Sequence, residues 1–128
     1  MTAKELRIGN WIKTENPNTE SQIANLGPEY LKVVIGGRNH TYFFSGNLIQ
    51  GIPITEEWLI NFGFFGLRET SMYGTQEFYN TGSKFKFGLG CFYVGHGDNK
   101  WEKLTCIKYV HQLQNLYFAL TGTELEMK

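Results

Sequence analysis

The chain has 128 residues, with 41% hydrophobic and 16% aromatic residues, 15 glycines and a formal net charge of zero. This length fits one domain whose core needs neither metals nor disulfides. The zero net charge argues against a duplex-DNA-binding protein, because contacts to phosphates usually need a surplus of basic residues. Aromatic side chains favour strands, so the composition predicts a strand-rich fold.

The acidic residues argue against several kinds of chemistry. The sequence has one aspartate, Asp98, against eleven glutamates. Aspartate is the usual carboxylate of metal sites, phosphoryl-transfer sites and catalytic triads. Glu56 and Glu57 are adjacent and would point about 100° apart on a helix, which suits helix capping better than paired acid–base catalysis. We therefore expect no enzyme, no catalytic residues and no cofactor.

The cysteines and the hydrophobic pattern predict the compartment. Cys91 and Cys106 are too few for a disulfide framework, and we expect both as free, buried side chains. No apolar stretch reaches the roughly 18 residues of a membrane-spanning helix, and Met1–Arg7 is too polar for a secretory signal peptide. The expected location is therefore a reducing cytoplasm, without a membrane partner.

The first fifty residues predict short strands and no helix. Residues 6–12 alternate as a half-buried strand with Leu6, Ile8 and Ile12 on its apolar face and a bend at Gly9-Asn10. Further strands are expected at 21–26, 30–35 and 39–44, with turns at Gly27-Pro28, Gly36-Gly37 and Ser45-Gly46-Asn47. This pattern predicts a small SH3-like or partly open β-barrel.

A short helix and a second group of strands are expected next. Thr55 is a predicted N-cap, and Gly63 ends the short central helix. The alternation from Lys84 to Phe87 predicts a strand with both phenylalanines inward. Antiparallel strands are expected at 64–69, 77–80, 84–88, 91–94 and 101–106, with a hairpin turn at Thr81-Gly82.

An amphipathic helix over 109–121 closes the chain, with Gly122 as its C′ residue. Its apolar arc contains Tyr109, Val110, Leu113, Leu116, Tyr117 and Leu120. The predicted fold class is α+β, with the N-terminal barrel, the central helix, antiparallel strands and the closing helix packed on the sheet. We expect one compact domain over 1–128, with a β-rich lobe at 1–50 and an α+β lobe at 51–128 as a subdivision.

The opposite face of this closing helix is unusual because it carries no charged residue from 109 to 123. It presents His111, Gln114, Asn115 and Phe118, whereas a solvated face normally shows lysine and glutamate. We expect this face to be covered, and Phe118 to be largely buried. The cover is the N-terminal lobe, a second subunit or other protein, or a small ligand, and these four residues are the predicted binding residues.

A repeated cysteine–histidine spacing raises the question of zinc. Four residues separate Cys91 from His96, and four separate Cys106 from His111. Two cysteines and two histidines can complete a tetrahedral zinc shell, but structural sites usually begin with a close cysteine pair on a turn. Because Cys91 lies in a predicted strand instead, we expect no metal site, and the meaning of the spacing stays open.

Single-stranded nucleic acid is an alternative ligand. The segment 84–108 contains five lysines against Asp98 and Glu102, so it is locally basic. Exposed aromatic and basic side chains on a partly open barrel can stack bases and contact phosphates. The candidate residues are Arg38, His40, Tyr42, Lys84 and Lys86, with Phe92 and Tyr93 as further aromatics.

Three blocks carry a family likeness: residues 6–10 (LRIGN), 52–59 (IPITEEWL) and 107–122 (IKYVHQLQNLYFALTG). They resemble a group of small uncharacterised proteins encoded by gut anaerobes and their phages. The resemblance implies a phage or mobile-element setting, in the host cytoplasm, and no catalytic residues. The resulting hypothesis is a non-enzymatic binding protein that acts on host defence by binding a protein or sequestering a small ligand, with self-association as one partner choice. The alternative is a single-stranded nucleic-acid-binding protein, and a small hydrolase ranks after it.

Overall fold

The computed structural model describes residues 2–15, 18–66, 78–79, 84–88, 90–95 and 100–127. Its fold class is α+β, as predicted. The chain divides into two compact units, a first unit of Met1–Pro53 with Tyr109–Glu124, and a second unit of Ile54–Lys108 with Leu125–Lys128. These units differ from the lobes drawn from the sequence, because the C-terminal helix groups with the first unit.

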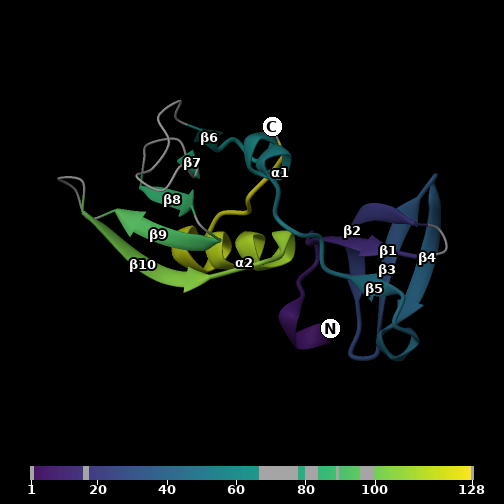
Figure 1. The fold of residues 1–128 in the computed structure, drawn as a ribbon. Helices are drawn as coiled ribbons and strands as arrows, with labels where there is room; N and C mark the ends of the chain where they lie inside the picture. Colours follow the sequence, from purple (N-terminus) through teal and green to yellow (C-terminus); the bar gives the residue numbers. More distant parts are fainter. Residues whose placement is uncertain are drawn as a thin grey trace. The chain divides into compact units, whose positions relative to one another are not determined.

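The first unit contains a curled, half-barrel antiparallel sheet with strand order β4-β3-β2-β1-β5 (Figure 1). Short 3-10 helices at Ala3–Glu5 and Phe44–Gly46 precede β1 and β5. The strands are β1 (Trp11–Thr14), β2 (Thr19–Leu26), β3 (Tyr30–Ile35), β4 (Arg38–Phe43) and β5 (Ile49–Gln50). This confirms the small, partly open barrel expected from the first fifty residues.

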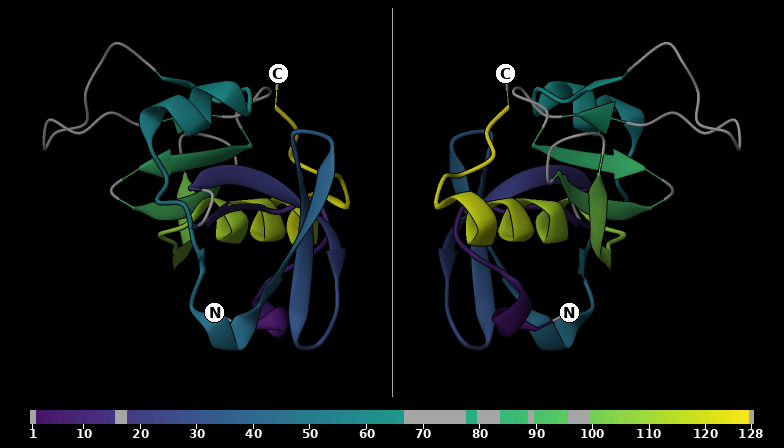
Figure 2. Two further views of the ribbon diagram at one scale, coloured as in Figure 1. Left: turned by 90° about the vertical axis from the view of Figure 1, so that its right-hand side faces the viewer. Right: turned by 90° about the vertical axis from the view of Figure 1, so that its left-hand side faces the viewer.

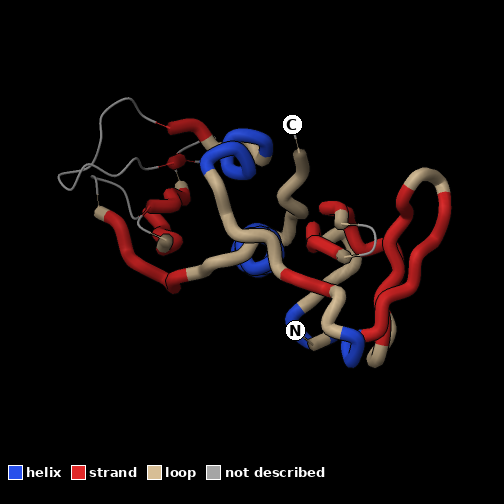
Figure 3. The backbone as a smooth tube through the Cα atoms, turned by 45° about the vertical axis from the view of Figure 1, so that its right-hand side comes forward, coloured by secondary structure: helices blue, strands red, loops and turns tan. Residues whose placement is uncertain are grey.

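Strands β3 and β4 form a hairpin whose turn is made by two glycines (Figure 3). Gly36 and Gly37 have φ values of 59° and 80°, which only glycine adopts without a steric cost. The two strands then pair without interruption, from Ile35 opposite Arg38 to Tyr30 opposite Phe43. The predicted hairpin is confirmed.

The start of the chain departs from the predicted strand. Leu6 and Ile12 are buried as expected, but Ile8 is 61% exposed. The alternation fails because residues 3–5 form a 3-10 helix, Gly9 takes a φ of 95°, and β1 begins only at Trp11. The prediction that Ile8 lies on the apolar face is therefore wrong. The core residues of this unit are Leu6, Ile12, Ile23, Leu31, Val33 and Tyr42.

Helix α2 (Val110–Thr121) packs against β1 of the same unit (Figure 2). Tyr109 is its N-cap, and Gly122 ends it with a φ of 73°, so both ends agree with the sequence. The buried face is rotated from the predicted arc, because His111 and Gln114 are buried with Val110 and Leu113. Leu120, which the arc placed inside, is 42% exposed.

The second unit begins with α1 (Glu56–Asn61) and continues into a second antiparallel sheet. Thr55 caps α1 as predicted, since its hydroxyl accepts the Trp58 N–H at 3.3 Å. The strand order is β10-β9-β8-β7-β6. The strands are β6 (Phe65–Gly66), β7 (Phe78–Tyr79), β8 (Phe85–Gly88), β9 (Cys91–Gly95) and β10 (Trp101–Cys106).

One face of this second sheet is apolar and buried. Phe78, Phe87 and Phe92 are direct cross-strand partners, so they form one row across β7, β8 and β9. The Phe85 and Phe92 rings lie 5.5 Å apart. The inward phenylalanines of β8 are confirmed. The large apolar side chains buried in this unit are Trp58, Leu59, Phe62, Phe64, Phe78, Phe85, Phe87, Phe92 and Leu125.

The two cysteines are joined in a disulfide between β9 and β10. The prediction that Cys91 and Cys106 are free is therefore wrong. The sequence alone could not pair them, because only the strand register makes them direct partners. Disulfides persist mainly in oxidising compartments, so the cytoplasmic location stays a prediction.

Some predictions concern residues that the structure does not describe. His96 and the Thr81-Gly82 turn lie outside them. Within the described ranges, no group of three or more metal-ligating side chains gathers. Among the same residues, no helix has both the length and the apolar character needed to cross a membrane.

Candidate binding surfaces

The polar face of α2 is bonded to the start of the chain within the first unit. The side-chain oxygen of Gln114 accepts the backbone N–H of Trp11 at 2.8 Å, and its amide nitrogen donates to the Gly9 carbonyl at 3.1 Å. Gln114 is only 2% exposed. Its amide group thus satisfies two backbone groups beside the turn that leads into β1.

Asn115 continues the same network. Its oxygen accepts from Arg7 Nη1 at 3.1 Å and from Asn10 Nδ2 at 2.9 Å, while its amide nitrogen donates to the Glu5 carbonyl at 2.9 Å. The N-terminal segment therefore covers Gln114 and Asn115. The N-terminal lobe is one of the three possibilities that the sequence left open for this face.

Arg7 joins this segment to Phe118. Its guanidinium carbon lies 3.9 Å from the centroid of the Phe118 ring and its Nη2 pairs with Glu124. Phe118 exposes 38% of its surface, so it is not largely buried as predicted, and Arg7 covers one face of its ring within the unit. A cation over an aromatic ring is worth about 0.5–1 kcal/mol at an exposed position.

His111 has a different environment. It is 1% exposed, its ring stacks on Tyr109 at 5.7 Å with 10° between the planes, and neither ring nitrogen has a hydrogen-bond partner in the described structure. Burial lowers the pKa of the imidazole below its ordinary 6.5, an effect that the Glu5 carboxylate opposes. His111 is therefore a neutral, buried side chain near pH 7.

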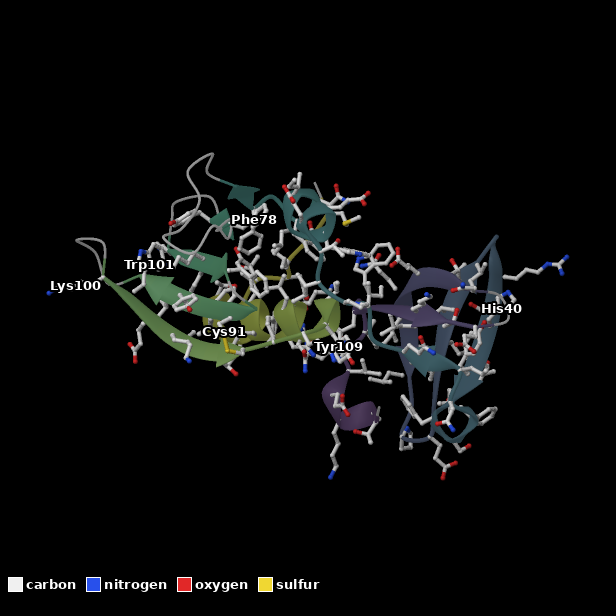
Figure 4. The ribbon with its side chains drawn as sticks, viewed as in Figure 1. His40, Phe78, Cys91, Lys100, Trp101 and Tyr109 are labelled. Atoms are coloured by element: carbon white, nitrogen blue, oxygen red, sulfur yellow. A yellow bond between two sulfur atoms is a disulfide. The ribbon has the colours of Figure 1, made fainter. Side chains whose placement is uncertain are left out.

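The predicted nucleic-acid residues fall in both units. Arg38, His40 and Tyr42 lie on β4 of the first unit, and Lys84 and Lys86 lie in the second. Arg38 is exposed. His40, which Figure 4 labels on β4, is half-buried. Tyr42 is 6% exposed and belongs to the core, so its ring is not available for stacking a base.

On the outer face of the second sheet, tyrosine and lysine side chains alternate from strand to strand. Tyr79 on β7 is opposite Lys86 on β8, Lys86 is opposite Tyr93 on β9, and Tyr93 is opposite Lys103 on β10. Cross-strand partners share a face, so this row lies opposite the buried phenylalanine row. Tyr79, Lys86 and Tyr93 are half-buried, and Lys103 is exposed.

Trp101 adds a second aromatic surface beside this row, from the start of β10 (Figure 4). Its ring lies over Gly95, where a Cβ would come within 3.1 Å of it, and it meets the Tyr79 ring edge-on at 5.7 Å. The Lys86 ammonium lies 4.9 Å from the Trp101 centroid and 5.0 Å from the Tyr93 centroid. The five residues Tyr79, Lys86, Tyr93, Trp101 and Lys103 are called the aromatic–lysine face below.

Sequence reasoning found only part of this face. It named Lys86 and Tyr93, but it omitted Tyr79, Trp101 and Lys103, which lie on two other strands. It also named Phe92, which is fully buried. The available signal was the alternation along β8 and β9, but joining four strands requires their register. Lys84 is exposed just before β8.

Comparisons of this chain with protein-family models, with curated proteins and with solved structures found no match.

Proposed function

We propose that this chain is a non-enzymatic binding protein whose aromatic–lysine face binds single-stranded nucleic acid. The observation that carries the proposal is the position of the Lys86 ammonium between the Tyr93 and Trp101 rings on one sheet face. The phage setting, the action on host defence and self-association remain predictions. We base no interface on His111, Gln114 and Asn115, because these side chains are buried or bonded inside the first unit.

The side chains of this face have the two properties that single strands need. Bases stack on aromatic rings with about 1–3 kcal/mol for each base, and they do so with little regard to sequence, since every base has a π-face. Neighbouring strands are about 4.8 Å apart, so the backbones of Tyr79 and Tyr93, with β8 between them, are about 10 Å apart. Lys86 and Lys103 alternate with these rings and can contact the phosphates between stacked bases.

Local charge favours an anionic ligand here although the whole chain is neutral. The outer row contains two lysines, and Lys84 and Lys100 are exposed close to it in sequence. Glu102 is opposite Val94, which places it in the row of the other sheet face. A duplex would offer its bases only at the groove edges, so stacking on these rings requires a single strand.

The test is fluorescence anisotropy with a dye-labelled oligothymidine and with a labelled duplex of the same length, at low and at high salt. We expect salt-sensitive binding of the single strand and weaker binding of the duplex. Lys86→Ala should weaken binding of the single strand. The matched control is Lys32→Ala, which removes a lysine 5.8 Å from the Tyr30 ring in the first unit and should leave affinity unchanged. Absence of binding at low salt, or an equal loss in both variants, contradicts the proposal.

A further inference from the structure

The Cys91–Cys106 disulfide lies on the same sheet as the aromatic–lysine face. Cys91 is two residues before Tyr93 on β9, so the two side chains share the outer side of the sheet. Cys106 is the direct partner of Cys91 on β10, the strand that also carries Trp101 and Lys103. The covalent bond therefore joins the two strands that supply most of the face.

In the described part of the sheet, strand β10 is paired on one side only. It is the edge strand of the sheet, and its described ladder runs to β9 alone. That ladder is irregular between Lys103 and Thr105, where the register shifts by one residue. A bulge disrupts pairing locally, and edge strands have neighbours on one side only. The disulfide thus fixes the end of β10 beyond the irregularity, together with the hydrogen bond that the Ile107 N–H donates to the Gly90 carbonyl at 3.0 Å.

The two sulfurs differ in access. Cys106 is exposed, whereas Cys91 is 8% exposed. A thiolate of a dithiol reductant reaches Cys106 first and bonds to its sulfur, and the Cys91 sulfur leaves as a thiolate and takes up a proton. The second thiol of the reductant then attacks the mixed disulfide and releases the Cys106 thiol. Two electrons and two protons pass to the cysteines, and the reductant becomes its own disulfide.

We propose that this disulfide is a redox switch for the aromatic–lysine face, closed when oxidised and opened by a dithiol reductant. The inference rests on the proposed function. Reduction removes the covalent tie at Cys106, and we expect the edge strand to loosen from that end through the irregularity at Lys103, so that Lys103 and then Trp101 lose their places beside Tyr93 and Lys86. Loss of one stacked base weakens binding of the single strand by about fivefold to 150-fold.

The experiment compares the folded, oxidised protein with the same protein after reduction by dithiothreitol and blocking of its thiols. Two readouts are used, anisotropy with labelled oligothymidine and hydrogen exchange of the amides from Trp101 to Cys106. We expect weaker binding and faster exchange in β10 after reduction, with the exchange of β3 and β4 unchanged. Cys91→Ala with Cys106→Ala should behave like the reduced protein and should not respond to dithiothreitol.

The outcomes separate this inference from the proposed function. Equal binding before and after reduction, in a protein that binds when oxidised, overturns the switch and leaves the function. If the oxidised protein does not bind, the proposed function fails. Hydrogen exchange then tests separately whether the disulfide holds β10 in place. If the amides of β10 stay equally protected after reduction, the disulfide does not hold the strand, and the switch is overturned as well. Faster exchange throughout both units would also overturn it, because it would show general unfolding.

Discussion

The side-chain oxygen of Gln114 accepts a hydrogen bond from the backbone N–H of Trp11 at 2.8 Å, although the two residues are 103 positions apart in sequence. The same side chain donates to the Gly9 carbonyl. Gln114 thus replaces the strand partner that the backbone lacks where Gly9 turns the chain into β1. This contact explains why the face of α2 is uncharged. An amide side chain can both accept from one backbone N–H and donate to one backbone carbonyl.

Gln114→Leu should therefore lower the free energy of unfolding by about 1–3 kcal/mol, because it removes the buried amide that bonds both the Trp11 N–H and the Gly9 carbonyl. The control is Gln22→Leu. Gln22 also donates to the Gly9 carbonyl, at 3.0 Å, but it is exposed, so water replaces its bond and the expected change is below about 0.5 kcal/mol. Urea denaturation followed by circular dichroism measures both. Equal losses would show that the buried amide is not special.

A close approach at Gly51 leads to a second prediction. A Cβ on Gly51 would come within 2.7 Å of the Tyr109 ring and 3.2 Å of His111 Cε1. The backbone is tied there, because Val110 N–H donates to the Ile52 carbonyl at 2.8 Å. Gly51→Ala should therefore cost about 1–3 kcal/mol of stability through crowding.

Gly46→Ala is the matched control for this change. A Cβ on Gly46 meets nothing within 4 Å, and Gly46 has no positive φ. Alanine there should be neutral or slightly stabilising, since it restricts the unfolded chain. Thermal unfolding of the two variants provides the comparison. A Gly51→Ala protein as stable as the wild type would mean that the Tyr109 ring moves aside at little cost.

Local signals in the sequence were sufficient for much of the fold. The Thr55 cap, the Gly36-Gly37 turn and the alternation around Phe85 each depend on neighbouring residues, and each is confirmed. Ile8 and Leu120 were placed wrongly because periodicity reports an apolar face but not what lies against it. Polar groups of the N-terminal turn rotate the buried face of α2 toward Gln114.

The candidate site was less predictable, and the reason is strand register. Tyr79, Lys86, Tyr93 and Lys103 lie on four strands and become one row only when all three ladders are in place. The same holds for Cys91 and Cys106, whose separation of 15 residues predicts neither contact nor its absence. A one-residue shift of any strand would turn its side chains to the other face.

Stacking and charge make separable contributions to the proposed nucleic-acid binding. Tyr93→Leu should weaken binding of the single strand by about 1–3 kcal/mol with an unchanged salt slope, because it removes a ring and no charge. Tyr93→Phe should retain the affinity. Lys103→Ala should lower the slope of log affinity against log salt by about 1, because it removes one phosphate contact. Titrations at several salt concentrations measure these slopes. A slope that changes with Tyr93→Leu, or an affinity lost with Tyr93→Phe, would contradict stacking on this ring.

The last prediction concerns how the protonation of His111 makes the stability of the protein depend on pH. Its folded pKa lies below the ordinary 6.5 because burial disfavours the imidazolium, the N-terminal amine adds to this effect, and the Glu5 carboxylate opposes it. The unfolded chain therefore binds more protons than the folded chain as the pH falls below 6.5. Stability should fall through that window and stop falling, for this group, below its folded pKa.

His111→Phe removes the titrating group while keeping a ring that can stack on Tyr109. We expect this variant to match or exceed the wild type at pH 7, because no unpaired ring nitrogen is buried, and to lose less stability between about pH 7 and about pH 5. Gln22→Leu, which removes no titratable group from an exposed position, is the control and should keep the wild-type dependence. Urea denaturation across this pH range measures the difference. Parallel pH profiles for wild type and His111→Phe would mean that the loss of stability at low pH does not come from protonation of His111.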